Sequence, residues 1–488
     1  MLSTRVWGFA AVLLLAASVA SAAEVKNLVK EFKKAVYSDQ ESEAISLVGQ
    51  IAGVGGEEAL EGLYEIGFSD YSAKASVYDA IIKAFNQPSG AIAFIDAKYE
   101  KSKSKPDFRE RVFQVDVLNS TRENDAVGSV TVLMKMLDDK SVHVQSAAVM
   151  ALQKSMVREA VEPLLKLLDD LTKKKRRDTL YYDVQDALLL LTGFQFETME
   201  DWWNWWEPNA ASFDPKATNT GGKTGVERKR EKDDSDFFGV PILSQHVVFV
   251  LDTSGSMRYV MRDDIKGLSE GDGSDSGGGK PSDEQMTAEG RLLAQFWTRL
   301  ECAKRNLKRV IRRLKPGTSY NLVSFDSDVL VFQKGAVTAS PGVNSKAFKW
   351  IDGMKHQGET NTLDALKSAF GANAKTTDLY LLSDGLPSKD GKRNDPTGPI
   401  LDEVKAMNRF RKIKIHTFGF AVELFGSGGQ QGGLAEANAF LKQLAESTGG
   451  KFTLIKVNPK ETPDNPDPAP EKDPGEKKNS TLAPVALQ

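Results

Sequence analysis

Residues 246–257 (HVVFVLDTSGSM) decide the fold of the second half of this 488-residue chain. The run HVVFVL contains no charged residue, as expected of a parallel strand that is buried on both faces of a sheet. Asp252, Ser254 and Ser256 follow at alternate positions, so one carboxylate and two hydroxyls project from a single tight loop. These oxygen groups suit a hard cation such as Mg2+, which prefers near-octahedral geometry and keeps bound water. The alternative is that they only cap the following helix.

The sequence downstream alternates between short apolar runs and helical patterns. The apolar runs lie at 320–325 (YNLVSF), 329–332 (VLVF), 379–382 (LYLL), 413–418 (IKIHTF) and 452–455 (FTLI). Apolar residues at helical spacing occupy 299–314, 345–354, 362–370, 400–410 and 434–447. This alternation predicts an α/β fold with a doubly wound, mainly parallel sheet that binds ligands at the carboxyl ends of its strands. The run 329–332 follows its predecessor too closely for a crossover, so we expect an antiparallel edge strand there.

Two later loops extend the pattern that the first loop begins. Residues 358–362 (GETNT) precede a predicted helix, and residues 383–385 (SDG) follow the predicted strand at 379–382. Together with DTSGS at 252–256, these loops resemble the metal-ion-dependent adhesion site of von Willebrand factor A domains, the family that includes integrin I domains. The resemblance spans about 240–456, and it implies the doubly wound, Rossmann-like fold of that family.

The resemblance also implies a set of metal ligands. Ser254, Ser256 and Thr360 would contact the metal, and Asp252 and Asp384 would bind it directly or through water. The cation would be Mg2+, with Ca2+ or Mn2+ as alternatives. Such a site leaves one position open, which implies a protein partner that presents Asp or Glu to the metal.

One segment departs from the family pattern. Residues 258–290, rich in Gly, Asp and Ser, separate the first metal loop from the next predicted helix. We expect a flexible insertion beside the metal, with a second calcium site as the alternative. The loops at 386–399 and 423–433 are expected at the same rim.

The first part of the chain reads as successive helices. Apolar residues recur at steps of three and four, as in Val144, Ala147 and Ala148, and the pattern returns about 40 residues later at Val184 and Ala187. Residues 125–192 resemble HEAT repeats, which implies an α-solenoid, whereas the alternative is a non-repetitive helical bundle. The tryptophans at 202, 203, 205 and 206 are interpreted as a cap on the last repeat, or alternatively as a ligand platform.

The chain ends have compositions of their own. Arg5, a short apolar run and Ala20-Ser21-Ala22 are typical of a cleaved signal peptide, so we expect an exported, envelope or secreted bacterial protein without a membrane span after cleavage. The alternative is an uncleaved anchor. Cys302 is the only cysteine, which excludes an intramolecular disulfide. The predicted organisation is a signal peptide at 1–22, a HEAT-like helical domain at 23–207, a linker at 208–239, an A-type domain at 240–457 and a disordered tail at 458–488.

Charge and motif content narrow the function. A net charge of -3 argues against a general nucleic-acid binder. The sequence contains four histidines, but it shows no Ser-His-Asp order, no spacing of zinc ligands and no phosphate-binding loop. We therefore expect a binding protein and not an enzyme. The predicted function is metal-dependent adhesion or assembly, with the helical repeats as a second interaction surface. The alternatives are a scaffold whose metal is structural and a metal-dependent hydrolase.

Overall fold

The computed structural model describes residues 21–69, 74–218, 235–259, 298–391, 394–420 and 431–455. Nearly all of the predicted signal peptide, most of the insertion at 258–290, most of the loop at 423–433 and the tail at 458–488 lie outside the described residues. Among the residues that are described, no helix combines the length and the apolar character needed to cross a bilayer.

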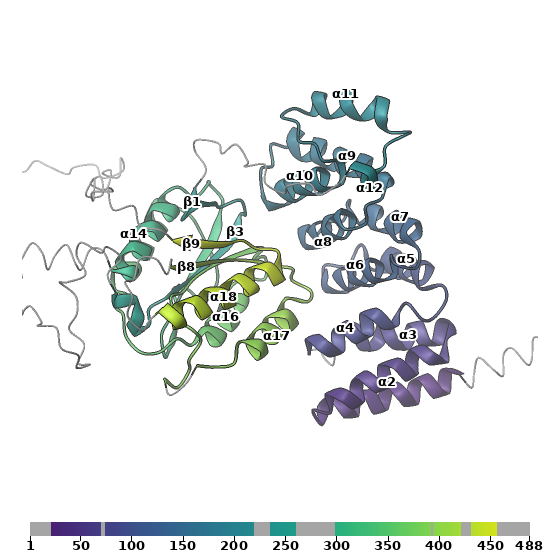
Figure 1. Cartoon of the computed structure of the whole chain (residues 1–488), viewed down its shortest axis with the longest axis horizontal. Coiled ribbons are helices and arrows are strands. Elements are labelled where there is room, and N and C mark those ends of the chain that lie inside the picture. The colour runs from purple at the N-terminus through teal and green to yellow at the C-terminus, as the bar shows by residue number, and fades with distance from the viewer. Residues whose placement is uncertain are drawn as a thin grey trace, which may run out of the picture.

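The N-terminal region is all-helical, as predicted. Residues 21–37 are helical, and further helices follow in a column that runs from α2 to α11 (Figure 1). The HEAT-like repeat itself stays a prediction. The bounds are α2 (Glu41–Val54), α3 (Gly56–Gly67), α4 (Ala75–Ala84), α5 (Ala91–Ser102), α6 (Arg109–Thr121), α7 (Ala126–Met136), α8 (Val142–Gln153), α9 (Val161–Lys173), α10 (Thr179–Thr192), α11 (Met199–Asn209) and α12 (Pro215–Thr218).

Local sequence explains where these helices begin and end. At α10, the Asp178 side chain accepts the backbone N–H of Tyr181 and caps the first turn. Gly193 ends the helix with φ of 76°, a left-handed conformation that glycine adopts without steric cost. In α11, Trp202 and Trp206 are buried in the helical core, whereas Trp203 and Trp205 are partly buried against it. This burial favours the cap interpretation of the tryptophans.

A seven-stranded mixed sheet forms the centre of the second region. Its order is β5-β4-β3-β7-β8-β9, and β6 also pairs with β4. The strands β4, β3, β7, β8 and β9 are parallel, whereas β5 is antiparallel at the edge, as predicted from the run 329–332. The bounds are β3 (His246–Asp252), β4 (Ser319–Phe325), β5 (Val329–Val331), β6 (Val337–Thr338), β7 (Asp378–Leu382), β8 (Lys414–Phe420) and β9 (Phe452–Ile455).

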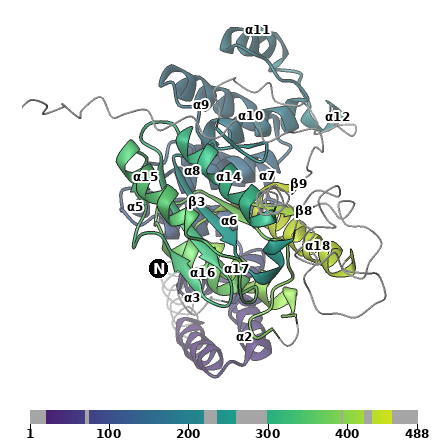
Figure 2. The ribbon, with the colours of Figure 1, turned by 90° about the vertical axis from the view of Figure 1, so that its left-hand side faces the viewer.

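Helices cover both faces of this sheet. In β3, Val247, Phe249 and Leu251 point to one face, where they pack with α14 (Arg299–Arg312) and α15 (Pro341–Asp352). Val248 and Val250 point to the other face and pack with three helices (Figure 2). Those three helices are α16 (Thr362–Gly371), α17 (Thr397–Asn408) and α18 (Gln431–Thr448). The predicted α/β fold is therefore confirmed.

The segment predicted as a linker, 208–239, contains regular secondary structure near both of its ends. The helix α12 lies near its start, and β1 (Asp236–Phe237) lies near its end and pairs with β2 (Val240–Pro241), which follows directly after the predicted linker. Phe237 is fully buried, and its ring meets those of Phe249 and Phe418 at centroid distances of 5.7 and 4.9 Å. Burial of this one large aromatic residue attaches a polar segment to the core. The middle of the linker lies outside the described residues.

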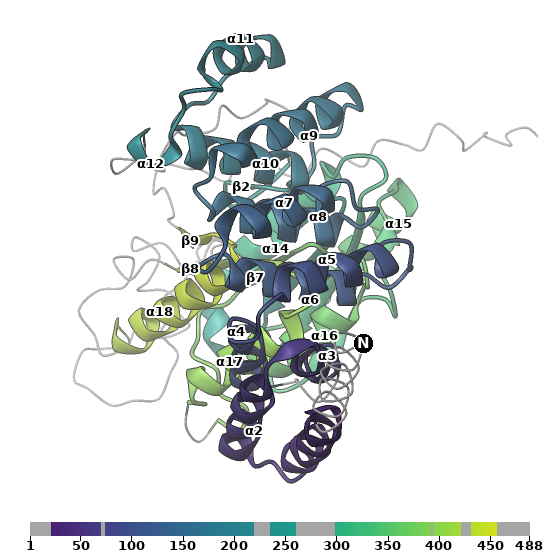
Figure 3. The same cartoon turned by 90° about the vertical axis from the view of Figure 1, so that its right-hand side faces the viewer.

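The helical column docks against the amino ends of the strands. Lys414, the first residue of β8, forms an ion pair with Asp183 of α10. Thr179 of α10 donates to Asp378, the first residue of β7, at 2.9 Å. Figures 1 and 3 show the column beside α17 and α18. We call this end of the sheet the docking pole, and the opposite end, where β3 and β7 finish, the metal pole.

Candidate metal centre

The first predicted metal loop begins where β3 ends. Asp252 is the last residue of β3 and is fully buried. Its Oδ1 accepts the backbone N–H of Ser254 at 2.7 Å, and its Oδ2 accepts the hydroxyl of Ser383, which follows the neighbouring β7. The chain then enters a short 3-10 turn, Gly255–Arg258. Asp252 is thus fixed between two parallel strands at the metal pole.

The two serines of this loop face the predicted aspartate loop. The hydroxyl oxygens of Ser254 and Ser256 lie 3.1 Å apart, and Ser256 Oγ donates to Asp384 Oδ1 at 2.6 Å. Ser254 and Asp384 are both buried. Parallel neighbouring strands end at the same edge of a sheet, and this explains why two loops so distant in sequence meet here. Four of the five predicted ligands are therefore brought together.

The predicted threonine loop reaches the same place. The backbone N–H of Gly255 donates to the carbonyl of Gly358 at 3.0 Å, and Thr360 forms a two-way backbone bridge with Ser388. A Cβ atom on Gly385 would lie 3.1 Å from Thr360 Oγ1 and 3.8 Å from Ser256 Oγ. The hydroxyls of Thr360 and Ser256 therefore lie around a position where only glycine fits without displacement. All five predicted ligands meet at one edge of the sheet.

The charges of the two aspartates interact at this edge. The pKa of Asp252 is raised to about 7, first because burial disfavours the charged form and then because Asp384 carries a like charge nearby. Hydrogen bonds from Ser254 and Ser383 act in the opposite direction. Burial and the neighbouring carboxylate therefore make Asp252 hold a proton more readily than an exposed aspartate does.

Sequence reasoning missed one cation beside the aspartates. Arg299, the first residue of α14, forms an ion pair through its NH1 with Asp384 Oδ2, and both side chains are almost completely buried. Arg299 follows the insertion and belongs to no motif. Its contact with Asp384 spans 85 positions of sequence, so no local spacing could have indicated it.

The chemistry of the donors fits a hard divalent cation. All five predicted ligands offer oxygen atoms, two from carboxylates and three from hydroxyls, which is the donor type that Mg2+ and Mn2+ prefer. A dication between Asp252 and Asp384 would also remove the repulsion that raises the pKa of Asp252. The residues present thus fit the metal that the sequence resemblance implies.

Three of the histidines lie away from this centre. His416 contacts Asp378 at the docking pole, His246 begins β3 at the same pole, and His143 belongs to α8 of the helical column. His356 is exposed in the chain before the threonine loop, and its neighbour Gln357 donates its backbone N–H to the carbonyl of Thr253 at 2.8 Å. His356 is thus the histidine that lies near the rim among the four, all of which are in the described part of the chain.

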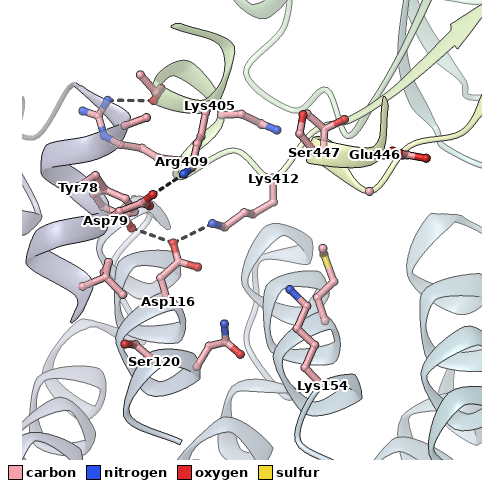
Figure 4. Close-up of a pocket in the computed structure, with 18 residues that line it drawn as sticks. Tyr78, Asp79, Asp116, Ser120, Lys154, Lys405, Arg409, Lys412, Glu446 and Ser447 are labelled. Atoms are coloured by element: carbon pink, nitrogen blue, oxygen red, sulfur yellow. Dashed lines mark hydrogen bonds and ion pairs between the residues drawn. The ribbon is translucent and has the colours of Figure 1, made fainter. Parts of the chain in front are cut away.

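A cavity of about 500 Å³ lies between the helical column and the α/β region (Figure 4). Two ion pairs cross it: Lys412 contacts Asp116 at 2.7 Å, and Lys405 contacts Asp79. The Tyr78 hydroxyl also donates to Asp116, at 2.8 Å. Because charges from one region neutralise charges from the other, we assign these groups to docking and not to ligand binding.

Comparisons with known proteins show what the second region is similar to. Residues 297–454 match the model of the von Willebrand factor type A domain family. This chain is 32% identical over 158 residues to human von Willebrand factor A domain-containing protein 3B, and 31% identical over 224 residues to human protein 3A. These matches cover 32% and 44% of this chain but only 10% and 14% of the relatives. The model match contains Thr360 and Asp384, whereas the first metal loop precedes it.

Solved structures with weaker similarity include two bacterial proteins. One is BatB from Bacteroides thetaiotaomicron, with 15% identity, a TM-score of 0.28 and coverage of 44% of this chain and 91% of that one. The other is the PilB minor pilin from Streptococcus sanguinis, with 15% identity, a TM-score of 0.29 and coverage of 43% and 56%. Scores this low carry no argument about function. From the family match and the fold, we conclude that this is a multidomain protein in which an all-helical region precedes a von Willebrand factor A-like α/β domain.

Proposed function

We propose that this protein is an exported, metal-dependent binding protein that acts in adhesion or assembly. In this proposal, Asp252, Ser254, Ser256, Thr360 and Asp384 hold Mg2+, or Ca2+ or Mn2+, and an Asp or Glu of a protein partner completes the coordination. The observation that carries the proposal is the meeting of these five oxygen-bearing side chains at one edge of the sheet, from three separate loops.

The position of the helical region agrees with this role. It docks through Asp183 and Thr179 at the amino ends of the strands, which is the end of the sheet opposite the metal pole. In the proposal, the metal pole binds one partner, and the helical surface, interpreted as HEAT-like repeats, holds a second. The A-type domain suggests protein–protein interaction, and we propose no catalytic role for the metal.

A second function is favoured by one specific observation. The three loops are already joined by hydrogen bonds, including those from Ser256 to Asp384 and from Gly255 to Gly358. In a scaffold protein, a metal would only strengthen these links, and the helical region would carry recognition. The two functions differ in whether a partner needs the metal.

Calorimetric titration of Mg2+ or Mn2+ into the purified protein tests the metal site first. Wild type should bind one cation, and Asp252→Asn should bind none, because the variant lacks a carboxylate that the cation needs. Asp328→Asn is the matched control, since Asp328 is an exposed acid beside the same loops and is outside the predicted set. Equal binding by wild type and Asp252→Asn would refute the site.

Partner capture from an envelope fraction then separates the two functions. A partner recovered by wild type in Mg2+, but lost in chelator and lost with folded Asp252→Asn, supports direct metal-dependent binding. A partner that is recovered equally in all three cases supports the scaffold. The thermal melting curve of each variant shows whether its fold is retained.

A further inference from the structure

The carboxylate of Asp384 is shared between two different groups. Its Oδ1 accepts the hydroxyl of Ser256 at 2.6 Å, and its Oδ2 is paired with the NH1 of Arg299. The exposed fraction is 5% for the Arg299 side chain and 0% for that of Asp384. A buried ion pair therefore includes one of the five predicted metal ligands.

Arg299 is held in this position by its surroundings. Its backbone N–H donates to the carbonyl of Tyr259 at 2.9 Å, which joins the start of α14 to the end of the first metal loop. The central carbon of its guanidinium lies 5.2 Å from the ring centroid of Tyr259 and 5.4 Å from that of Phe420. Guanidinium groups interact favourably with aromatic rings at such distances. A backbone hydrogen bond and two aromatic rings thus hold Arg299 where it pairs with Asp384.

The net charge of the site determines how favourably a divalent cation can bind there. Asp252 and Asp384 together carry two negative charges when both are ionised, and Arg299 supplies one positive charge. A divalent cation added while Arg299 stays in place would give a net charge of plus one in a buried site, whereas without Arg299 the charges would cancel. Interactions between charges are strong where water is largely excluded. Arg299 therefore competes with a divalent cation for Asp384.

We propose that Arg299 is a built-in counter-cation that lowers the affinity of the metal centre for divalent cations. Arg299 is a positioning residue that acts through Asp384 and is not itself a metal ligand. It neutralises the charge of Asp384 when no metal is bound, and the site fills only at cation concentrations high enough to draw Asp384 away from the guanidinium. This inference rests on the proposed metal-binding function.

The test is a calorimetric titration of Mn2+ and Mg2+ into the full protein and three variants. Arg299→Gln removes the charge and keeps a polar group, and we expect it to bind Mn2+ at least tenfold more tightly than wild type. Arg299→Lys keeps the charge but loses the planar contact with the two rings, so its affinity should be intermediate. Arg258→Gln removes a neighbouring exposed cation that donates to the Gly255 carbonyl, and the affinity of this variant should stay within twofold of wild type.

The outcomes distinguish a failure of the proposed role of Arg299 from a failure of the proposed metal site. Equal or weaker binding by Arg299→Gln, with normal binding by wild type, overturns the role of Arg299 and leaves the metal site intact. Absence of binding in wild type and in Arg299→Gln alike overturns both. If Arg299→Gln does not fold, Arg299→Lys decides alone, and an affinity equal to or weaker than that of wild type overturns the inference.

Discussion

The two poles of the A-type domain are built from different kinds of residue. At the metal pole, short side chains such as Ser254, Ser256 and Asp384 are tied to one another within about one hydrogen-bond length. At the docking pole, long charged side chains such as Lys412 and Lys414 reach across to the helical column. One pole is a compact network of short polar side chains, whereas the other contacts a second part of the same chain.

This difference affects how well each pole can be predicted from the sequence. The metal pole is encoded in three short motifs that are recognisable when they are taken together. The docking pole is encoded in pairs such as Lys414 and Asp183, which lie 231 positions apart. No local pattern joins such residues. If the two poles are independent, changes at one should leave the properties of the other unchanged, and the following predictions test this.

The largest effect is expected from Phe410→Ala at the docking pole. Phe410 is buried, and its ring meets those of Tyr78 and Phe68 edge to face, with centroids 5.7 and 6.0 Å away. Removal of a buried Phe side chain typically costs about 3–5 kcal/mol. Denaturant unfolding should show a loss of this order, whereas Leu330→Ala, at a 61% exposed position, should change little. A changed affinity for Mg2+ in folded Phe410→Ala would show that the poles are coupled.

Lys414→Met should have the next largest effect. The Lys414–Asp183 ion pair is mostly buried, and breaking such a pair from one side leaves an uncompensated charge, at a cost of about 3 kcal/mol. The double variant Lys414→Met with Asp183→Leu should regain part of that loss, because the charge of Asp183 is then no longer buried without its partner. Unfolding free energies of the four proteins form a double-mutant cycle, and strictly additive losses would argue against the pair.

His143 should make the docking pole sensitive to acid. Its Nδ1–H donates to the carbonyl of Arg411 at 2.9 Å, and burial lowers the pKa of His143 to about 4. The unfolded chain takes up a proton near pH 6.5 and the folded protein only near pH 4, so stability is lost as the pH falls through this window, by roughly 2–3 kcal/mol. His143→Gln keeps a donor but cannot titrate, so its unfolding free energy should fall less between pH 7 and pH 4. Parallel pH profiles for the two proteins would contradict this assignment.

The smallest effect is expected from Lys405→Ala. The ion pair between Lys405 and Asp79 also crosses the domain boundary, but the two side chains are 56% and 44% exposed. Exposed pairs contribute less than about 1 kcal/mol and are weakened by salt. Unfolding at low and high salt should show a small difference from wild type that disappears in salt. If Lys405→Ala lowered the free energy of unfolding as much as Lys414→Met does, burial would not explain which of these ion pairs stabilises the protein more.

The sequence predicted the sheet well because buried parallel strands have a simple pattern. The runs that begin at 246, 320, 379, 413 and 452 are all strands, with ends shifted by at most two residues in the structure. The pair β1–β2 was missed, since each strand has only two residues. Its visible signal was the short apolar run 237–243 (FFGVPIL), which begins in the predicted linker and ends in the predicted A-type domain.

The predicted metal ligands could be selected from sequence because each lies directly after a strand or before a helix. Such positions place Asp252, Thr360 and Asp384 at one edge of a doubly wound sheet, whatever the details of packing. Arg299 could not be selected in this way. Its position depends on where the chain returns after the insertion, which no spacing determines.

Binding of a divalent cation at Asp252 can be tested through the melting temperatures of wild type and of Asp252→Ala, each measured in Mg2+ and in chelator. Metal binding to the native state stabilises it by about 2.7 kcal/mol at a hundredfold excess over Kd. Wild type should therefore melt at a higher temperature in Mg2+ than in chelator, whereas Asp252→Ala should melt at the same temperature in both. An equal gain from Mg2+ in the two proteins would contradict the account, because the stabilising metal would then bind somewhere other than at Asp252.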